Sequence, residues 1–276
     1  MPIPVFTCCL PRDLHILRLA VAGLREHLHA ESISVATAPI HFAKFRRELG
    51  PDVKLLDEDA LIPGLTLDAL RRAGFTYPER MNGWYFQQLL KFAYAFSLPD
   101  DADYLIWDAD TVLLRPIDLF DEQGRTWFTK ADEYHEPYFE SYERLLGLVA
   151  PREFSFISQH MVVKVGVLRE MMARIEAHCP GDENWAWKIM RNLSPQTSNR
   201  FSEYETYGHY VKQVHPEMAA FRRLEWTRDG ALESFHPRRR HLRRLAERYV
   251  FAAFESRQSF WNRFAAWRKR RFPWLG

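Results

Sequence analysis

The sequence contains little cysteine and no long apolar segment. Its 276 residues include three cysteines, Cys8, Cys9 and Cys179. An adjacent pair on one strand rarely closes a disulfide, and an odd total is no disulfide framework. No apolar run approaches the ~18–20 residues of a membrane span, and the N-terminus lacks the basic and apolar regions of a secretory signal. We therefore expect a protein of the reducing cytoplasm.

Several well-known site motifs are also absent. The chain has no Gly-x-Gly-x-x-Gly and no Gly-x-x-x-x-Gly-Lys-[Ser/Thr], which argues against a dinucleotide-binding fold and a P-loop ATPase. It has no Gly-x-Ser-x-Gly nucleophile elbow of a hydrolase. With 47% hydrophobic and 27% charged residues, the composition is that of an ordinary globular protein and excludes disorder.

The net charge of +2 conceals an uneven distribution. Residues 236–276 hold 12 of the 38 Lys and Arg residues but 2 of the 36 Asp and Glu residues, a net charge of +10. Residues 1–235 therefore carry −8. An acidic body is followed by a strongly basic tail, and such a division predicts different partners for the two parts.

Strand-like and helix-like segments alternate in the first half of the chain. Short apolar or β-branched runs at 3–9, 33–38, 53–56 and 104–107 are separated by segments with helical spacing, the strongest at 84–96. This alternation predicts an α/β fold with a mostly parallel sheet. We expect one domain over 1–235, with 58–80 as a loop or short helical excursion, and a helical basic tail over 236–276.

The most informative segment is an acidic turn after a buried strand. The string DYLIWDADTVLLRP at 103–116 places Asp108 and Asp110 directly after Leu-Ile-Trp. Residues two apart in an extended chain point to one side, and open α/β sheets bind ligands at the carboxyl ends of their strands. Two adjacent carboxylates suit a hard cation, Mn²⁺ or Mg²⁺.

This segment resembles the metal-binding Asp-x-Asp segment of GT-A glycosyltransferases. NGWYFQQLLK at 82–91, FISQH at 156–160 and FSEYETYG at 201–208 are similar to a bacterial branch of uncharacterised GT-A-like proteins. The resemblance implies a nucleotide-binding αβα sandwich over about residues 1–220. It also implies a divalent cation held against the diphosphate of a nucleotide-sugar donor (UDP or similar).

The resemblance implies roles for the two aspartates. Asp110 would ligate the metal directly, and Asp108 would bind the metal or the donor ribose, directly or through water. GT-A enzymes often add a C-terminal His or acid as a third ligand. Our candidate is His215, with His209 and His236 behind it.

Other polar residues have both a structural and a functional interpretation. Lys91 lies outside the apolar stripe of its helix and either faces solvent or meets the donor phosphates. Ser202 and Glu205 fit a capping box, which leaves Glu203 as the favoured general base of an inverting transfer, with Glu205 as the alternative. A retaining enzyme would need no such base.

Two further groups are candidate ligand contacts. Ser158, Gln159 and His160 follow a strand end and are candidates for binding sugar hydroxyls or the acceptor. Thr7 and Asp13 lie near the end of the first strand, where GT-A folds hold the nucleotide, although Asp13 also suits a helix N-cap.

The tail combines basic residues with apolar and aromatic residues at helical spacing. Leu242, Leu245, Ala246, Tyr249, Val250 and Ala253 form one series, and Phe260, Trp261, Phe264 and Trp267 form another. The combination suits an anionic membrane surface or packing on the acidic body. That body would repel a phosphate backbone, so no nucleic acid is expected.

The function predicted from the sequence is a metal-dependent glycosyltransferase. It would act on a cell-envelope glycan or lipid-linked acceptor, in the cytoplasm or on the inner face of the membrane. The alternatives are a nucleotidyltransferase of sugar-nucleotide metabolism and a non-catalytic nucleotide-sugar-binding protein. A nucleotidyltransferase normally needs a Gly- and basic-rich loop after the first strand, where this chain has only Arg12.

Overall fold

A five-stranded sheet forms the centre of the protein, in the order β3-β2-β1-β4-β7. The computed structural model describes residues 3–195 and 199–255. Strands β1 to β4 run parallel, and β7 pairs antiparallel with β4. The strands span Pro4–Cys8 (β1), Ser32–Thr37 (β2), Val53–Asp57 (β3), Asp103–Trp107 (β4) and His160–Lys164 (β7). The predicted α/β fold with a mostly parallel sheet is confirmed.

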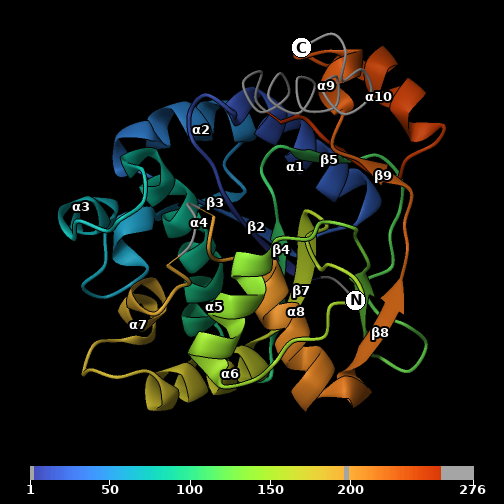
Figure 1. Ribbon diagram of the computed structural model, residues 1–276. Helices are drawn as coiled ribbons and strands as arrows, with labels where there is room; N and C mark the ends of the chain where they lie inside the picture. Colours follow the sequence, from blue (N-terminus) through green and yellow to red (C-terminus); the bar gives the residue numbers. More distant parts are fainter. Residues whose placement is uncertain (1–2, 196–198, 256–276) are drawn as a thin grey trace, which may run out of the picture.

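Helices cover both faces of this sheet (Figure 1). The helices are Leu14–His27 (α1), Phe42–Leu49 (α2), Leu67–Arg72 (α3), Asn82–Ala93 (α4), Glu136–Leu146 (α5), Val165–His178 (α6), Trp185–Arg191 (α7), Glu203–Val214 (α8), Gly230–Glu233 (α9) and Arg239–Ala246 (α10). In Figure 1, α1 and α2 lie above the sheet and α5, α6 and α8 lie below it. Segment 58–80, expected to be a loop or a short helical excursion, contains α3.

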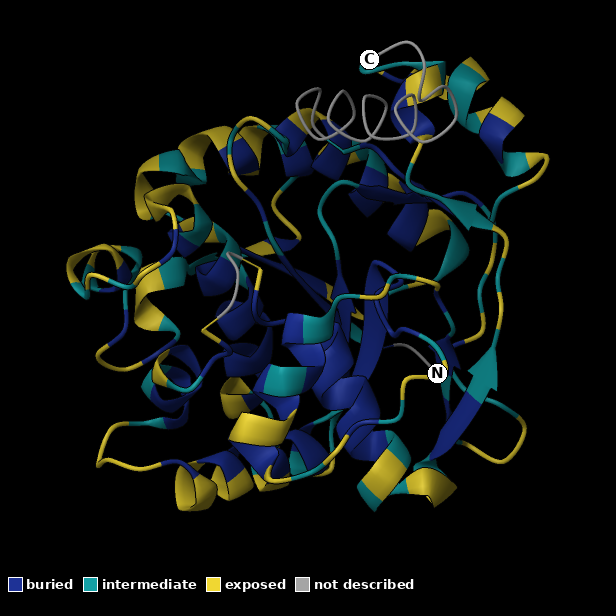
Figure 2. Ribbon diagram, viewed as in Figure 1, coloured by how far each residue is buried: buried dark blue, intermediate teal, exposed yellow. Residues whose placement is uncertain are grey.

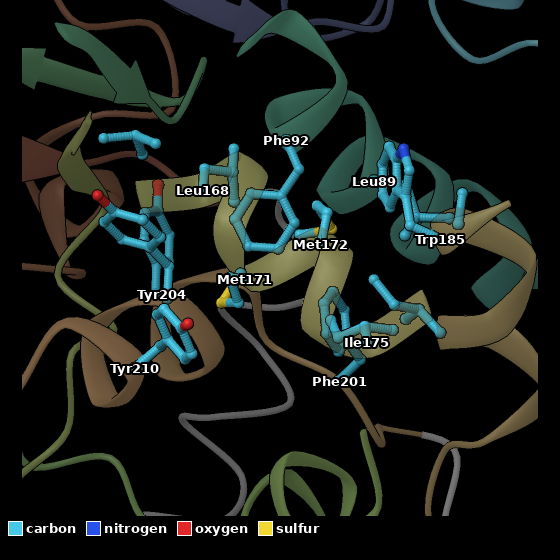
Figure 3. Close-up of a cluster of buried hydrophobic side chains, with 14 of the residues drawn as sticks. Leu89, Phe92, Leu168, Met171, Met172, Ile175, Trp185, Phe201, Tyr204 and Tyr210 are labelled. Atoms are coloured by element: carbon cyan, nitrogen blue, oxygen red, sulfur yellow. The ribbon is translucent and has the colours of Figure 1, made fainter. Parts of the chain in front are cut away.

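Alternate strand residues build the two apolar cores. Val5 and Leu105 pack with α1 and α2, whereas Phe6 and Ile106 point to the other face and pack with α4 and α6. Successive side chains of a strand point to opposite faces, so a sheet covered on both sides is apolar throughout. Figure 3 shows the second core, in which the ring of Phe92 of α4 lies, in this view, between Leu168 and Met172 of α6. Figure 2 shows the exposed residues on the outer faces of these helices.

Two small sheets complete the fold. Strands β5 (Thr111–Leu113), β10 (Phe251–Ala253) and β9 (Trp226–Thr227) form one, and β6 (Thr126–Thr129) pairs with β8 (Ala219–Arg222) in the other. Because β5 follows the acidic turn directly, its antiparallel pairing with β10 brings the C-terminal part of the chain to that turn. The turn is therefore held from both sides.

The basic tail is only partly helical. Leu242, Leu245 and Ala246 pack from α10 onto an apolar cluster as the spacing predicts. The expectation that Ala253 continues this helix is wrong, because residues 251–253 are fully buried in strand β10. Residues 249–254 are apolar without a break, which suits a strand buried on both sides. The aromatic series at 260–267 lies outside the described residues.

In residues 3–195 and 199–255, no helix has the length and apolarity that crossing a bilayer requires.

Candidate functional site

Asp108 and Asp110 line a cleft of about 890 Å³. They occupy the turn between β4 and β5, beside the carboxyl end of β1. The Asp108 amide donates to the Gln159 carbonyl (2.9 Å), and the Thr111 amide donates to the Asp108 carbonyl (3.0 Å). These bonds hold a tight turn in which both acidic residues line the same cleft, as their spacing predicts.

Lys91 connects this turn to a distant helix. Its ammonium donates hydrogen bonds to Oδ1 of Asp108 and to Oε1 of Glu203. Glu203 is the first residue of α8. Lys91 and Glu203 are buried, and the two carboxylates keep the pKa of Lys91 well above its usual value although burial opposes them. The solvated-face interpretation of Lys91 is therefore wrong, and its side chain lines the cleft.

Tyr204 contacts the same pair of charges. Its hydroxyl donates to Asp108 Oδ1 (2.9 Å), and its ring centroid lies 4.7 Å from Lys91 Nζ. Burial, followed by the charge of Asp108, raises the pKa of Tyr204 well above its usual value, so the hydroxyl remains a donor. Sequence analysis missed this residue, since nothing in the 201–208 string separates Tyr204 from the tyrosines of the core.

Asp110 has fewer compensating contacts than Asp108. Its carboxylate accepts a hydrogen bond from Thr111 Oγ1 (3.4 Å). Burial and the charges of Asp108, Glu255 and Asp13 raise its pKa to about 7, against a smaller opposing effect of Lys91. The Phe254 amide donates to the Asp110 carbonyl (2.7 Å), which brings Glu255 to the cleft beside it.

The carboxylate oxygens of Asp108 and Asp110 suit a cation that is bound together with a phosphate group. Among the described residues, no three His, Cys, Asp or Glu side chains form a group that could hold a metal ion. Mg²⁺ and its relatives usually take one or two carboxylates and complete their coordination with phosphate and water. The two carboxylates of Asp108 and Asp110 meet that requirement.

The three histidines considered as third ligand do not meet the two aspartates in the cleft. His215 ends α8 and pairs with Glu170 (2.9 Å). His209 is buried, with its Nε2 3.0 Å from Glu205 Oε2. His236 packs against His15, with ring centroids 5.0 Å apart, in a smaller neighbouring pocket. Local spacing gives no information on which of eleven histidines the tertiary fold brings to one point.

Glu205 has a structural task away from the cleft. Ser202 Oγ accepts from the Glu205 amide (3.3 Å), as the predicted N-cap requires. The Glu205 carboxylate, however, accepts from Ser155 Oγ and the Phe156 amide (3.3 Å) rather than reaching back to Ser202. Of the two candidate bases, the structure places Glu203 alone in the cleft lining.

The segment at 158–160 contributes one residue to the cleft. Gln159 lines it and adopts a left-handed backbone conformation (φ 68°). Ser158 is buried and donates to the His160 carbonyl (3.2 Å). His160 packs between Trp107 and Phe251, and burial lowers its pKa to about 4. Ser158 and His160 therefore support the turn from behind instead of lining the cleft.

Of the two candidate residues near the end of β1, one lines the cleft and the other does not. Asp13 lines the cleft together with Arg12, whose guanidinium lies 3.3 Å from it. Asp13 precedes α1 without a side-chain capping bond. Thr7 is buried within β1 and is absent from the cleft lining.

The cleft also contains residues that sequence analysis did not select. Glu133 and Arg228 form an ion pair (2.7 Å) at its edge, from loops far apart in the chain. Glu58 lies at the carboxyl end of β3, and burial raises its pKa. Its position after a predicted strand was an available signal, whereas the pairing of Glu133 with Arg228 left none.

Comparison with known proteins gives a family and a set of similar folds. The model of a family described as a family of unknown function (DUF6492) matches residues 12–273. No curated protein matches the chain.

Three solved structures illustrate the fold likeness. The galactosyltransferase LgtC has a TM-score of 0.46 and 11% identity, over 92% of this chain and 88% of that chain. Mouse xyloside xylosyltransferase 1 has a TM-score of 0.47 and 14% identity, over 92% of this chain and 97% of that chain. The bifunctional glycosyltransferase WbbM has a TM-score of 0.48 and 12% identity, over 92% of this chain and 46% of that chain. At these identities the likeness concerns the fold, and the chemistry of the site depends on the chain's own residues.

Proposed function

Because the chain belongs to the family of unknown function DUF6492, we propose its activity from the site itself: it is a glycosyltransferase that takes a sugar from a nucleotide-sugar donor. The observation that carries this proposal is the pair Asp108 and Asp110 in one turn that lines the cleft. The pair lies at the carboxyl end of β4, where open α/β sheets bind nucleotides. Residues 103–116 also resemble the metal-binding segment of GT-A enzymes.

The charge of the cleft supports a requirement for a divalent cation. Among the described residues, eight carboxylic and five basic side chains line it. Three of the bases are already paired with acids of the same lining: Lys91 with Asp108 and Glu203, Arg228 with Glu133, and Arg12 with Asp13. A diphosphate would be repelled by this excess of negative charge. In the proposal, Asp108 and Asp110 hold Mn²⁺ or Mg²⁺, which supplies electrostatic and Lewis-acid stabilisation of the leaving nucleoside diphosphate.

Glu203 is the proposed general base of an inverting transfer. It would take the proton of the acceptor hydroxyl as the new glycosidic bond forms. Burial raises the pKa of Glu203, and the charge of Asp108 adds to this effect while Lys91 opposes it. A carboxylate with a raised pKa is a stronger base, and Lys91 keeps it ionised and oriented toward the cleft.

The proposed acceptor is a cell-envelope glycan or a lipid-linked sugar at the cytoplasmic face of a membrane. Exposed arginines of α10 and the residue before it, Arg238, Arg239, Arg240 and Arg243, support contact with anionic lipid. Each basic residue near such a surface contributes about 1 kcal/mol. The smaller pocket beside His236 shares Arg12, Asp13 and Glu255 with the lining of the cleft.

Thermal unfolding with a panel of nucleoside diphosphates tests the proposal. We expect at least one diphosphate to raise the unfolding temperature in the presence of Mn²⁺ and to do so much less with EDTA. Asp110→Ala should abolish the metal-dependent part, whereas Asp132→Ala, an exposed acid outside the cleft lining, should keep it. A wild-type protein that no diphosphate stabilises would overturn the proposal.

Two further measurements separate the alternatives. A glycosyltransferase should slowly hydrolyse one nucleotide sugar of a panel and release its diphosphate, whereas a binding protein should not. A nucleotidyltransferase should be stabilised by a nucleoside triphosphate more than by the matching diphosphate.

A further inference from the structure

Asp108 receives two hydrogen bonds on the same oxygen. Lys91 Nζ and Tyr204 Oη both donate to its Oδ1. Within the part of the chain that the structure describes, no donor reaches Asp108 Oδ2. A carboxylate held in this way by two donors from two helices has a fixed plane, and the Asp108 side chain lines the cleft.

We propose that Tyr204 is a positioning residue that holds Asp108 so that Oδ2 is presented to a divalent cation. The inference rests on the proposed function, because it concerns the same site and the same metal. It adds a role for a residue whose hydroxyl touches neither Asp110 nor the acceptor base.

The position of Tyr204 is itself rigid. Helix α8 is capped by Ser202, and the Glu203 amide donates to Gln88 Oε1 of α4 (3.1 Å). Further along, Gly208 lets the helix approach the ring of Phe156, because a Cβ there would lie 2.3 Å from Phe156 Cγ. Two fixed points on the helix thus determine where the Tyr204 hydroxyl lies.

Lys91 alone would not fix Asp108 in the same way. A lysine ammonium is a compact charge on a flexible stem, with three donors that rotate freely. Its ammonium is also shared with Glu203. The Tyr204 hydroxyl lies at the end of a rigid ring packed against that ammonium. Its hydrogen bond therefore fixes the orientation of the Asp108 carboxylate, which the flexible lysine alone does not.

Outer contacts of this kind have a known magnitude. Partners that orient a metal-ligating side chain typically change metal affinity about 10–100-fold when they are removed. The Tyr204→Phe variant removes the hydroxyl and keeps the ring over Lys91. We therefore expect its affinity for Mn²⁺ to fall by about 10-fold or more.

The matched control is Tyr210→Phe. Tyr210 lies on the same helix, is buried, and its hydroxyl also donates to a carboxylate, Glu170 Oε1 (2.6 Å), but it is absent from the cleft lining. Figure 3 shows both tyrosines at the same side of the core. A general effect of losing one buried hydroxyl would appear equally in both variants.

The experiment measures Mn²⁺ binding by the electron paramagnetic resonance signal of the free ion, with and without UDP, in the wild type and both variants. Crystal structures of the metal-free proteins give the Asp108 side-chain torsion. Weaker Mn²⁺ binding by Tyr204→Phe, together with unchanged binding by Tyr210→Phe, supports the inference. Where the wild type binds Mn²⁺, equal affinity of Tyr204→Phe and wild type, or equal losses in both variants, overturns it.

The two proposals can fail separately. A wild type that binds no Mn²⁺ removes the metal from the proposed function, and the crystal structures then decide the positioning role. An Asp108 carboxylate that rotates in Tyr204→Phe but not in Tyr210→Phe supports positioning by Tyr204. An unchanged torsion in Tyr204→Phe overturns it.

Discussion

Glu203 at the start of α8 forms a buried ion pair with Lys91 on α4, although 112 positions of the chain separate the two residues. The same ammonium pairs with Asp108 in the acidic turn. One positive charge therefore joins the two helices and the turn that build the cleft. Its removal would leave two carboxylates in a site with few other cations.

We predict that Lys91→Met destabilises the protein by about 3–5 kcal/mol, the usual cost of leaving a buried charge without its partner. The side chains of Lys91 and Glu203 are 6% and 4% exposed. Urea unfolding at pH 7 measures the change.

Lys164→Met is the control for this prediction. Its pair with Asp103 is 25% and 26% exposed, and such a pair is worth about 0–1 kcal/mol. Similar losses in the two variants would mean that the Lys91 network adds nothing beyond an ordinary ion pair.

Glu203→Gln should separate catalysis from binding. Loss of a general base typically slows the chemical step by about 10²–10⁴-fold, while Asp108 and Asp110 remain to hold the donor. We expect sugar transfer to fall by this factor and the Mn²⁺-dependent stabilisation by the diphosphate to persist. A variant that transfers sugar at the wild-type rate would contradict the assignment of Glu203 as base and would favour a retaining reaction.

The contribution of Asp110 to the stability of the metal-free protein should fall as the pH rises from about 4 to about 7. The folded protein raises the pKa of Asp110 from 3.8 to about 7. Folding therefore favours the protonated acid, and this contribution is complete below the lower value and lost above the higher one. Asp110→Asn removes the titration, so its stability relative to wild type should rise with pH across this range.

Urea unfolding in EDTA at several pH values measures the difference. Asp132→Asn provides a control of opposite sign, because Arg223 lowers the pKa of Asp132. Its stability relative to wild type should fall with pH only below about pH 4 and stay level from about 4 to about 7. Parallel curves for Asp110→Asn and wild type would show that Asp110 is not perturbed.

Gly208→Ala should destabilise the protein by about 1–3 kcal/mol, the range for overpacking a close contact. The new methyl group would lie 2.3 Å from Phe156 Cγ, so α8 or the 154–156 segment has to move. Gly83→Ala is the control, since nothing lies within 4 Å of its Cβ position in α4. That change should be neutral or stabilising by up to about 1 kcal/mol.

Binding to anionic vesicles should depend on the exposed arginines of α10. Replacing Arg239, Arg240 and Arg243 with Gln should weaken co-sedimentation with phosphatidylserine vesicles at low salt, since each contributes about 1 kcal/mol. This variant retains β10, which a truncation near residue 236 would remove from its buried place beside β5.

The control for vesicle binding uses another basic helix. Lys44, Arg46 and Arg47 are exposed on α2, and their replacement by Gln changes the net charge equally. Equal losses in both triple variants would mean that overall charge, not α10, drives the contact.

Local patterns in the sequence predicted the fold class and the acidic turn. Strands of the parallel sheet were visible as short apolar runs, and Asp108 with Asp110 followed one of them at a spacing that puts both side chains on one side. Periodicity and turn position depend on neighbours in the chain, so they can be read without the tertiary structure. Lys91 gave a partial signal, because it is a charged residue between the apolar Leu90 and Phe92.

Contacts between distant segments were decided by the tertiary structure alone. No local sequence pattern predicts that Lys91 pairs with Glu203 or that the Tyr204 hydroxyl donates to Asp108. Likewise, no pattern predicts that His215 pairs with Glu170 and does not reach the acidic turn. The conformation of residues 251–253 was also decided by the tertiary structure. Their apolar run is compatible with a helix, but hydrogen bonds to β5 on one side and β9 on the other make it a strand. The sequence by itself determined which chemistry is available, and packing determined which groups meet, because burial favours many pairings equally until the whole fold selects one.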